Sequence, residues 1–250
     1  ADFSGTDWTN DFESRYPDDD AINAEYEAGT RKPEKLMAVT SWVVSTKDNL
    51  DKFKNEVRNH FNLDNLIAYY LITELFGMVD QRAKNMFLTY FHEEGKWIFI
   101  FYDNDTCFGL NNEGLIAFGY NIEYHDKIGT LNVWNGESSV LWNNLEKCFP
   151  SEIEAMYKDI RTRGLLSYDL IMSVLNGEQS DKWCEAIYNA DGRFKYIDPL
   201  IEEGNGSYLY AAQGSRIENR KWWTYNRFLY IDSKYTAGRF LSDFATLRLY

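Results

Sequence analysis

The chain has 250 residues, a formal net charge of −13 and 44% hydrophobic residues, which is enough apolar material for a full hydrophobic core. Nucleic acid and anionic membranes are polyanions, so the acidic excess excludes non-specific binding to either of them and favours cations. The three cysteines are widely spaced and form no CxxC pair, so they indicate neither a zinc site nor a disulfide framework.

The first predicted part of the chain is an N-terminal segment over residues 1–45, which is polar and acidic up to about Arg31 and includes the run Asp18–Asp20. We expect this segment to be irregular and to pack on the core through its aromatic side chains. The opening residues lack the basic start and the apolar run of a signal peptide, so no export signal is predicted there.

Two helices are predicted next. The first covers residues 46–61 with Thr46 as its N-cap, and the second starts at Asp64 and is stopped by Gly77. The second helix is apolar nearly all round, so we expect it to be central in the fold. Its apolar run is broken by Glu74 and is too short to cross a bilayer, so no membrane span is predicted.

A β-hairpin is the strongest local signal in the chain. Residues 86–91 and 97–102 are rich in aromatic and branched side chains, and Gly95 lies in the short connection between them. The apolar residues of both strands run almost without interruption, so we expect both faces of the hairpin to be covered. Residues 110–144 show no clear period and are predicted to be loop.

Helices are predicted again over residues 150–164 and 167–177, each closed by a glycine. A long helix is predicted over residues 208–235, and the alternating residues after it predict a strand. The whole pattern predicts an α+β fold that is mainly helical, with a central domain over residues 46–238. Residues 239–250 are expected to begin a following β segment, so that the chain is an excerpt from a longer protein.

Four oxygen-bearing side chains surround the predicted hairpin. Asp80 and Asn85 precede its first strand, and Asp103 and Asp105 follow its second. A phosphoryl-transfer site needs an aspartate that accepts the proton of the nucleophile, together with an amide oxygen and a carboxylate that hold Mg²⁺ on the phosphates. Because a short hairpin returns the chain to its starting point, we expect Asn85 and Asp103 to be near neighbours. The alternative is that these are ordinary turn residues, since Asp and Asn favour turns.

The stretch over residues 62–110 resembles the core signature of the CotH family, the spore-coat-protein-H kinase-like proteins. It has the apolar helix, the D…KN segment, the hairpin and the D-x-D-x-x-F-G turn of that signature. The family has an atypical protein-kinase fold, so the resemblance implies a kinase-like C-terminal lobe. It also implies Mg²⁺ or Mn²⁺ with ATP as cofactors if the chain is active. Carried over to this chain, the resemblance implies Asp80 as the catalytic aspartate and Asp103 as the metal-binding aspartate. It implies Asn85 as a metal or phosphate ligand and Asp105 as a second metal ligand or a support.

Arg82 and Lys84 lie inside the same segment. They are candidate phosphate contacts, although ion pairs with the neighbouring carboxylates are the more common role of such residues. No glycine-rich loop followed by a strand lysine precedes Asp80 in this sequence. The 250 residues alone are therefore expected to lack kinase activity, because the lobe that covers ATP is not among them.

The last predicted helix carries a basic stripe. Its members are spaced to share one helix face, and they are Arg216, Arg220, Trp223 and Arg227. The stripe is a candidate surface for phosphate or an acidic partner, with ion pairs inside the chain as the more common alternative. The helix also has more aromatic side chains than one core-facing stripe can bury, so we expect contacts with other subunits or domains of a larger assembly.

A second resemblance concerns the context of the chain. The segments WTNDFESRYPDDD, SWVVST and AAQGSRIENRKWWTYNRFLYIDSKY are similar to large tail-associated virion proteins of bacteriophages, some of which embed a CotH-like domain. This resemblance implies a structural or binding module located in a virion. The alternative is a metal-dependent protein kinase completed by an N-terminal lobe, with a bacterial extracellular or cell-surface location as the other possibility.

Overall fold

The computed structural model describes residues 3, 12, 20–83, 85–104, 106–110, 118–123, 139–175 and 216–236. Side chains are not described for a few of these, among them residues 216–219. The chain divides into two compact units, and each is considered by itself. Unit 1 draws on Ala1–Thr73, Val79–Asn104 and Glu123–Ile153, and unit 2 draws on Glu74–Met78, Asp105–Ile122 and Glu154–Tyr250.

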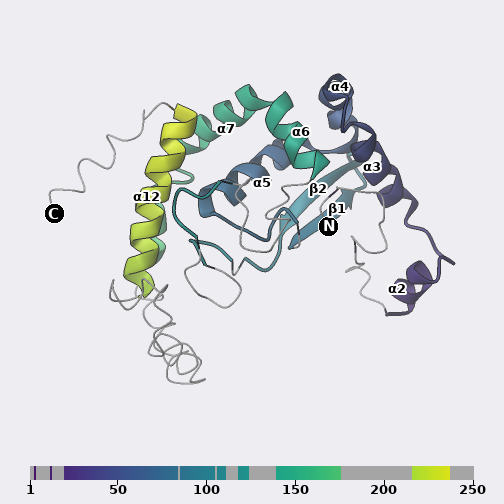
Figure 1. Ribbon diagram of the computed structural model, residues 1–250, viewed down its shortest axis with the longest axis horizontal. Coiled ribbons are helices and arrows are strands. Elements are labelled where there is room, and N and C mark those ends of the chain that lie inside the picture. The colour runs from purple at the N-terminus through teal and green to yellow at the C-terminus, as the bar shows by residue number, and fades with distance from the viewer. Residues whose placement is uncertain are drawn as a thin grey trace. The chain divides into compact units, whose positions relative to one another are not determined.

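The described helices and strands follow one another along the chain as labelled in Figure 1. They are α2 (Asp20–Glu27), α3 (Glu34–Ser45), α4 (Leu50–His60), α5 (Leu63–Phe76), β1 (Met86–Phe91), β2 (Lys96–Phe101), α6 (Val140–Cys148), α7 (Pro150–Thr162), α8 (Tyr168–Leu175) and α12 (Arg216–Thr236). The predicted mainly helical α+β fold with one central antiparallel hairpin is confirmed by these elements. No helix in the described part of the chain is both long enough and apolar enough to span a membrane.

Helix α5 is deeply buried, as its apolar sequence predicts. Leu66 and Tyr70 are fully buried, and Tyr69 is only 1% exposed. The helix ends at Phe76, one residue before Gly77, whose φ of 56° takes the chain out of the helical path. The predicted start and end of this helix are therefore correct to within one residue.

The hairpin of unit 1 packs one face on α5. β1 and β2 pair antiparallel with Met86 opposite Phe101, and the Phe101 ring stacks on Tyr69 at 4.3 Å between centroids. Figure 1 shows the hairpin beside α5. The other face carries Phe91 and Ile100, which are 39% and 45% exposed. The expectation that both faces are covered is therefore not met in the described part of the chain.

The N-terminal helices of unit 1 differ from the prediction. Helix α4 is capped by Asn49, whose side chain accepts a hydrogen bond from the backbone N–H of Lys52 at 3.0 Å. Thr46, the predicted cap, instead ends α3, and its hydroxyl donates back to the carbonyl of Val43. The prediction of an irregular segment over residues 1–45 is wrong where α2 and α3 form. Helix α3 buries Val39, Trp42 and Val43, so packing on the core stabilises a helix there.

Helix α6 begins inside the region that was predicted to be loop. Ser139 is its N-cap, and the helix is short, with Trp142 fully buried in unit 1. The Trp142 ring stacks on Tyr69 at 5.8 Å between centroids. Five other residues of the helix are buried as well, namely Val140, Leu141, Asn144, Leu145 and Cys148. Such burial stabilises a helix this short through tertiary packing, which a periodicity argument over nine residues does not detect.

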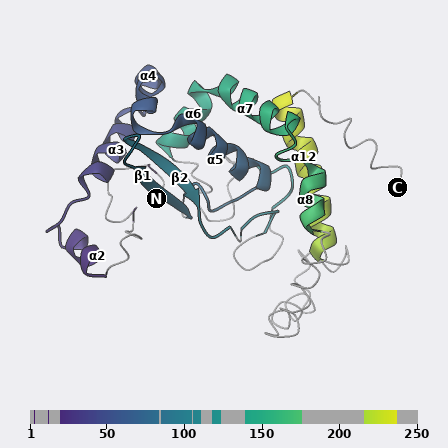
Figure 2. The same cartoon turned by 180° about the vertical axis from the view of Figure 1, so that it is seen from behind.

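Unit 2 contains most of α7, together with α8 and α12. Figure 2 shows α8 alongside α12. The hydroxyl of Ser167 accepts a hydrogen bond from the backbone N–H of Leu170 at 3.1 Å, so the predicted start of α8 is confirmed. Helix α12 covers residues 216–235 of the predicted long helix and ends one residue later, at Thr236. Residues 208–215, Gly177 and the predicted strand over 239–250 lie outside the described residues.

Gly109 should tolerate no side chain, because it combines a left-handed backbone with tight packing in unit 2. Its φ is 83°, and a Cβ there would lie 2.5 Å from the Phe118 carbonyl oxygen and 2.6 Å from Trp223 Nε1. We expect Gly109→Ala to lower the free energy of unfolding by about 2–5 kcal/mol, from backbone strain and overpacking together.

Gly164→Ala is the matched control in the same unit. Gly164 has a φ of 68°, but a Cβ added to it would meet no atom within 4 Å, so only the backbone strain of about 1–2 kcal/mol is expected. Urea unfolding of both variants measures the two losses. Equal losses would contradict the packing argument.

Candidate metal and phosphate site

The hairpin brings two of the predicted site residues together. Asn85 directly precedes Met86, and Met86 pairs with Phe101, so the two chain ends leave the hairpin side by side. Asn85 Nδ2 donates a hydrogen bond to the backbone carbonyl of Asp103 at 3.2 Å. The expected proximity of Asn85 and Asp103 is therefore observed, and it follows from the strand register alone.

Asp80 joins this pair through a tight backbone turn. Its carbonyl accepts hydrogen bonds from the N–H of Asn85 at 3.0 Å and from the N–H of Ala83 at 3.4 Å. These bonds turn Ala83 and Asn85 back towards Asp80 at the start of β1, and we call the segment with numbers 80–85 the Asp80 loop. Asn85 is only 7% exposed, Asp80 is half-buried and Asp103 is exposed. The three residues thus occupy one end of the hairpin in unit 1.

Asp103 has an unusual backbone that its neighbours hold in place. Its φ is 52°, in the left-handed region that L-residues with side chains seldom adopt. Besides Asn85, the side-chain amide of Gln81 donates to the Asp103 carbonyl at 2.9 Å. Sequence reasoning missed Gln81, because the only signal for it was its place next to Asp80.

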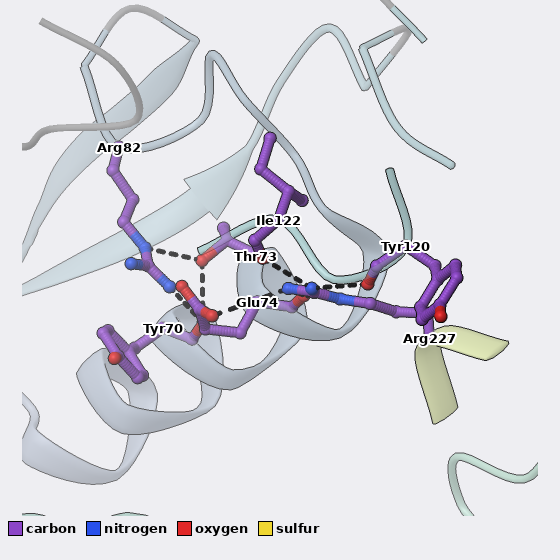
Figure 3. Close-up of polar contacts among 7 residues, drawn as sticks. All are labelled: Tyr70, Thr73, Glu74, Arg82, Tyr120, Ile122 and Arg227. Atoms are coloured by element: carbon purple, nitrogen blue, oxygen red, sulfur yellow. Dashed lines mark hydrogen bonds and ion pairs between the residues drawn. The ribbon is translucent and has the colours of Figure 1, made fainter. Parts of the chain in front are cut away.

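Arg82 has a different role from the one expected. Its side chain is fully buried, Nε donates to Thr73 Oγ1 at 2.7 Å, and Nη2 donates to the Tyr70 carbonyl at 2.8 Å. Figure 3 shows the guanidinium against these residues of α5. The backbone carbonyl of Arg82 also accepts a hydrogen bond from Trp142 Nε1 at 3.0 Å. Arg82 therefore fastens the Asp80 loop to α5 and α6, and its guanidinium is not exposed to contact phosphate.

The side-chain oxygens of Asp80, Asn85 and Asp103 are of the type that suits a hard divalent cation. Asn85 Nδ2 donates to the Asp103 carbonyl, so Oδ1 is the Asn85 atom suited to a cation, and Asp80 and Asp103 carry carboxylates, which are the ligand type that hard divalent cations prefer. Within the described ranges, no three His, Cys, Asp or Glu residues are grouped as a metal site. Asn85 is not one of these four residue types, so the candidate site does not depend on such a group. Asp105 and Lys84 lie outside the described residues.

The predicted basic stripe of α12 is largely internal to unit 2. Trp223 and Arg227 are each 1% exposed, and Arg220 is half-buried. Arg227 Nε donates to the Glu74 carbonyl at 2.9 Å, and Nη1 donates to the Tyr120 carbonyl at 2.8 Å, as drawn in Figure 3.

An ion pair joins Arg227 Nη2 to Glu74 Oε2 at 3.6 Å, with both side chains 2% exposed. The Arg227 guanidinium is therefore enclosed by the chain itself, which leaves it no surface on which to bind a partner. The side chain of Arg216 is not described.

Comparison with known protein families agrees with the resemblance found around the hairpin in the sequence. A family model described as CotH kinase protein matches residues 1–170, which is more than half of the chain and includes the Asp80 loop and Asp103. No curated protein and no solved structure matches the chain significantly. The chain belongs to the CotH kinase protein family.

Proposed function

We propose that this chain carries the metal-binding part of a metal-dependent protein kinase, which transfers a phosphoryl group from ATP to a protein when the N-terminal lobe is present. The observation that supports the proposal best is the hydrogen bond that joins Asn85 to the Asp103 carbonyl beside Asp80. It brings Asn85 next to Asp103 at the end of the hairpin where Asp80 also lies, and phosphoryl transfer uses an aspartate, an amide oxygen and a second carboxylate close to one another.

Each residue has a separate role in this proposal. Asp80 accepts the proton of the attacking hydroxyl, and Asn85 and Asp103 hold Mg²⁺ or Mn²⁺ on the phosphates. The cation, when bound, neutralises phosphate charge. By family resemblance Asp105 is a further metal ligand, and Lys84 is left as the phosphate contact within the Asp80 loop.

A second candidate function is a structural or binding module of a large bacteriophage virion protein. The sequence similarity of three segments to tail-associated virion proteins supports this candidate. In that setting the kinase-fold module binds other subunits or domains of the tail, and its cation site is retained for binding rather than for transfer. The virion is then its location, with a bacterial extracellular or cell-surface site as the location of the kinase.

Titration with Mn²⁺, with and without a non-hydrolysable ATP analogue, tests the shared cation site in the 250-residue chain. Absence of Mn²⁺ binding would overturn both the metal site and the kinase proposal. A transfer assay on this chain joined to an N-terminal kinase lobe then separates the two functions. ATP-dependent phosphorylation that is abolished by Asp80→Asn supports the kinase, whereas cation binding without any transfer supports the binding module.

A further inference from the structure

Gln81 binds the backbone of the candidate site from a fully buried position in unit 1. Its Nε2 donates to the carbonyls of Tyr102 and Asp103, both at 2.9 Å. Both N–H groups of the amide therefore have acceptors on the two residues that leave β2.

The other side of Gln81 is fixed by Tyr69 of α5. The Tyr69 hydroxyl contacts the Gln81 backbone carbonyl at 2.9 Å and its Oε1 at 3.1 Å. Burial raises the pKa of Tyr69 above its ordinary value, with Arg82 acting in the opposite direction, so the hydroxyl keeps its proton and can donate. The amide plane of Gln81 is thus held from both sides.

The contacts of Gln81 converge on the strained residue of the site. A left-handed backbone at an aspartate is strained and persists where surrounding contacts stabilise it. Here the side-chain amides of Gln81 and Asn85 both donate hydrogen bonds to the Asp103 carbonyl. Fixing that carbonyl fixes the direction in which the Cα–Cβ bond of Asp103 leaves the backbone, and so limits where its carboxylate can lie. A side-chain amide suits this task because it offers two donors and one acceptor in one plane.

We propose that Gln81 is the positioning residue of the site, which sets the Asp103 turn so that the site prefers small cations. This inference rests on the proposed function, because it concerns the same cation. Mg²⁺ demands near-ideal octahedral geometry, whereas Ca²⁺ accepts irregular coordination. A rigid Asp103 turn therefore favours Mg²⁺, and a loosened turn loses Mg²⁺ affinity more than Ca²⁺ affinity.

Gln81→Met in the whole chain tests the inference, since methionine keeps the volume but donates no hydrogen bond. Affinities for Mg²⁺ and Ca²⁺ are measured by displacement of Mn²⁺, which is followed by electron paramagnetic resonance. We expect Mg²⁺ affinity to fall by about tenfold or more, as for other residues that orient metal ligands, and Ca²⁺ affinity to change much less. An unchanged ratio of the two affinities would overturn the inference.

Asn65→Leu is the matched control. Asn65 is also an amide that binds the backbone of β2, with Nδ2 donating to the Phe99 carbonyl at 3.1 Å and Oδ1 accepting from the Phe99 N–H at 2.7 Å. Its loss should destabilise the same strand without touching Asp103. We therefore expect an unchanged ratio of Mg²⁺ to Ca²⁺ affinity in Asn65→Leu. An equal fall in that ratio would reduce Gln81 to a structural role.

Hydrogen exchange separates this inference from the proposed function. Faster exchange of the amides of Tyr102–Asn104 is expected in Gln81→Met and not in Asn65→Leu, whether or not a metal binds. If the wild-type chain binds no cation, the proposed function fails and the exchange result still decides the role of Gln81. If Gln81→Met does not fold, Tyr69→Phe takes its place, because it removes only the hydroxyl that contacts Gln81. It should lower the ratio of Mg²⁺ to Ca²⁺ affinity and speed the exchange of the Tyr102–Asn104 amides, both by less than Gln81→Met would. No shift in either readout would overturn the inference.

Discussion

Asp103→Asn is expected to lower Mn²⁺ affinity by about two orders of magnitude without unfolding the chain. The substitution removes a carboxylate charge from the ligand set, and ligand charge is a main determinant of affinity for hard cations. Asparagine tolerates the left-handed backbone that Asp103 adopts, with its φ of 52°. Asp103 is also exposed, so the free energy of unfolding should change by no more than about 0.5 kcal/mol.

Isothermal titration with Mn²⁺ and urea unfolding of the same variant measure both parts of this prediction. Asp51→Asn is the control, because Asp51 is a residue of α4 in the same unit that takes no part in the site. It should bind Mn²⁺ as the wild type does. If Asp103→Asn binds Mn²⁺ with wild-type affinity, Asp103 is a turn residue and not a ligand.

The largest expected effect on stability comes from Arg161 in α7. Its Nε and Nη2 donate to the Asp232 carboxylate of α12 at 2.9 and 2.8 Å, and the two side chains are 3% and 0% exposed. Tyr157 also contacts this carboxylate, at 2.7 Å. Arg161→Met removes the guanidinium from a buried carboxylate, and we expect the free energy of unfolding to fall by about 3–5 kcal/mol.

The double variant Arg161→Met with Asp232→Leu should recover most of that loss, because it replaces the buried ion pair with apolar side chains. Arg163→Met is the surface control. Arg163 pairs with Asp159 at 3.1 Å, but the two side chains are 61% and 58% exposed, so a change of no more than about 0.5 kcal/mol is expected. Urea unfolding measures all three variants. A double variant as unstable as Arg161→Met would show that the lost packing, not the unpaired charge, is responsible.

The parts of the fold that the sequence predicted are those decided by neighbours in the chain. Helix α5 was predicted because a long apolar run ends at a glycine, and the hairpin was predicted because its two strands are joined by a short turn with Gly95. Helix α6 begins where the sequence predicts loop, and Thr46, the predicted cap of α4, closes α3 instead. Both errors concern short helices, whose stability comes from tertiary packing more than from local propensity.

By itself, the sequence determined the order of the oxygen ligands and the hairpin that joins Asn85 to Asp103, because strand register is a local property. Only the tertiary structure decided what Gln81, Arg82 and Arg227 do. Their acceptors lie far away in the sequence, with 22 residues from Gln81 to Asp103, 12 from Arg82 to Tyr70 and 153 from Arg227 to Glu74. Periodicity reports which face of an element is apolar, but it carries no information about which distant carbonyl a buried donor meets. A buried donor must find an acceptor somewhere, and the packing of the helices determines which one it is.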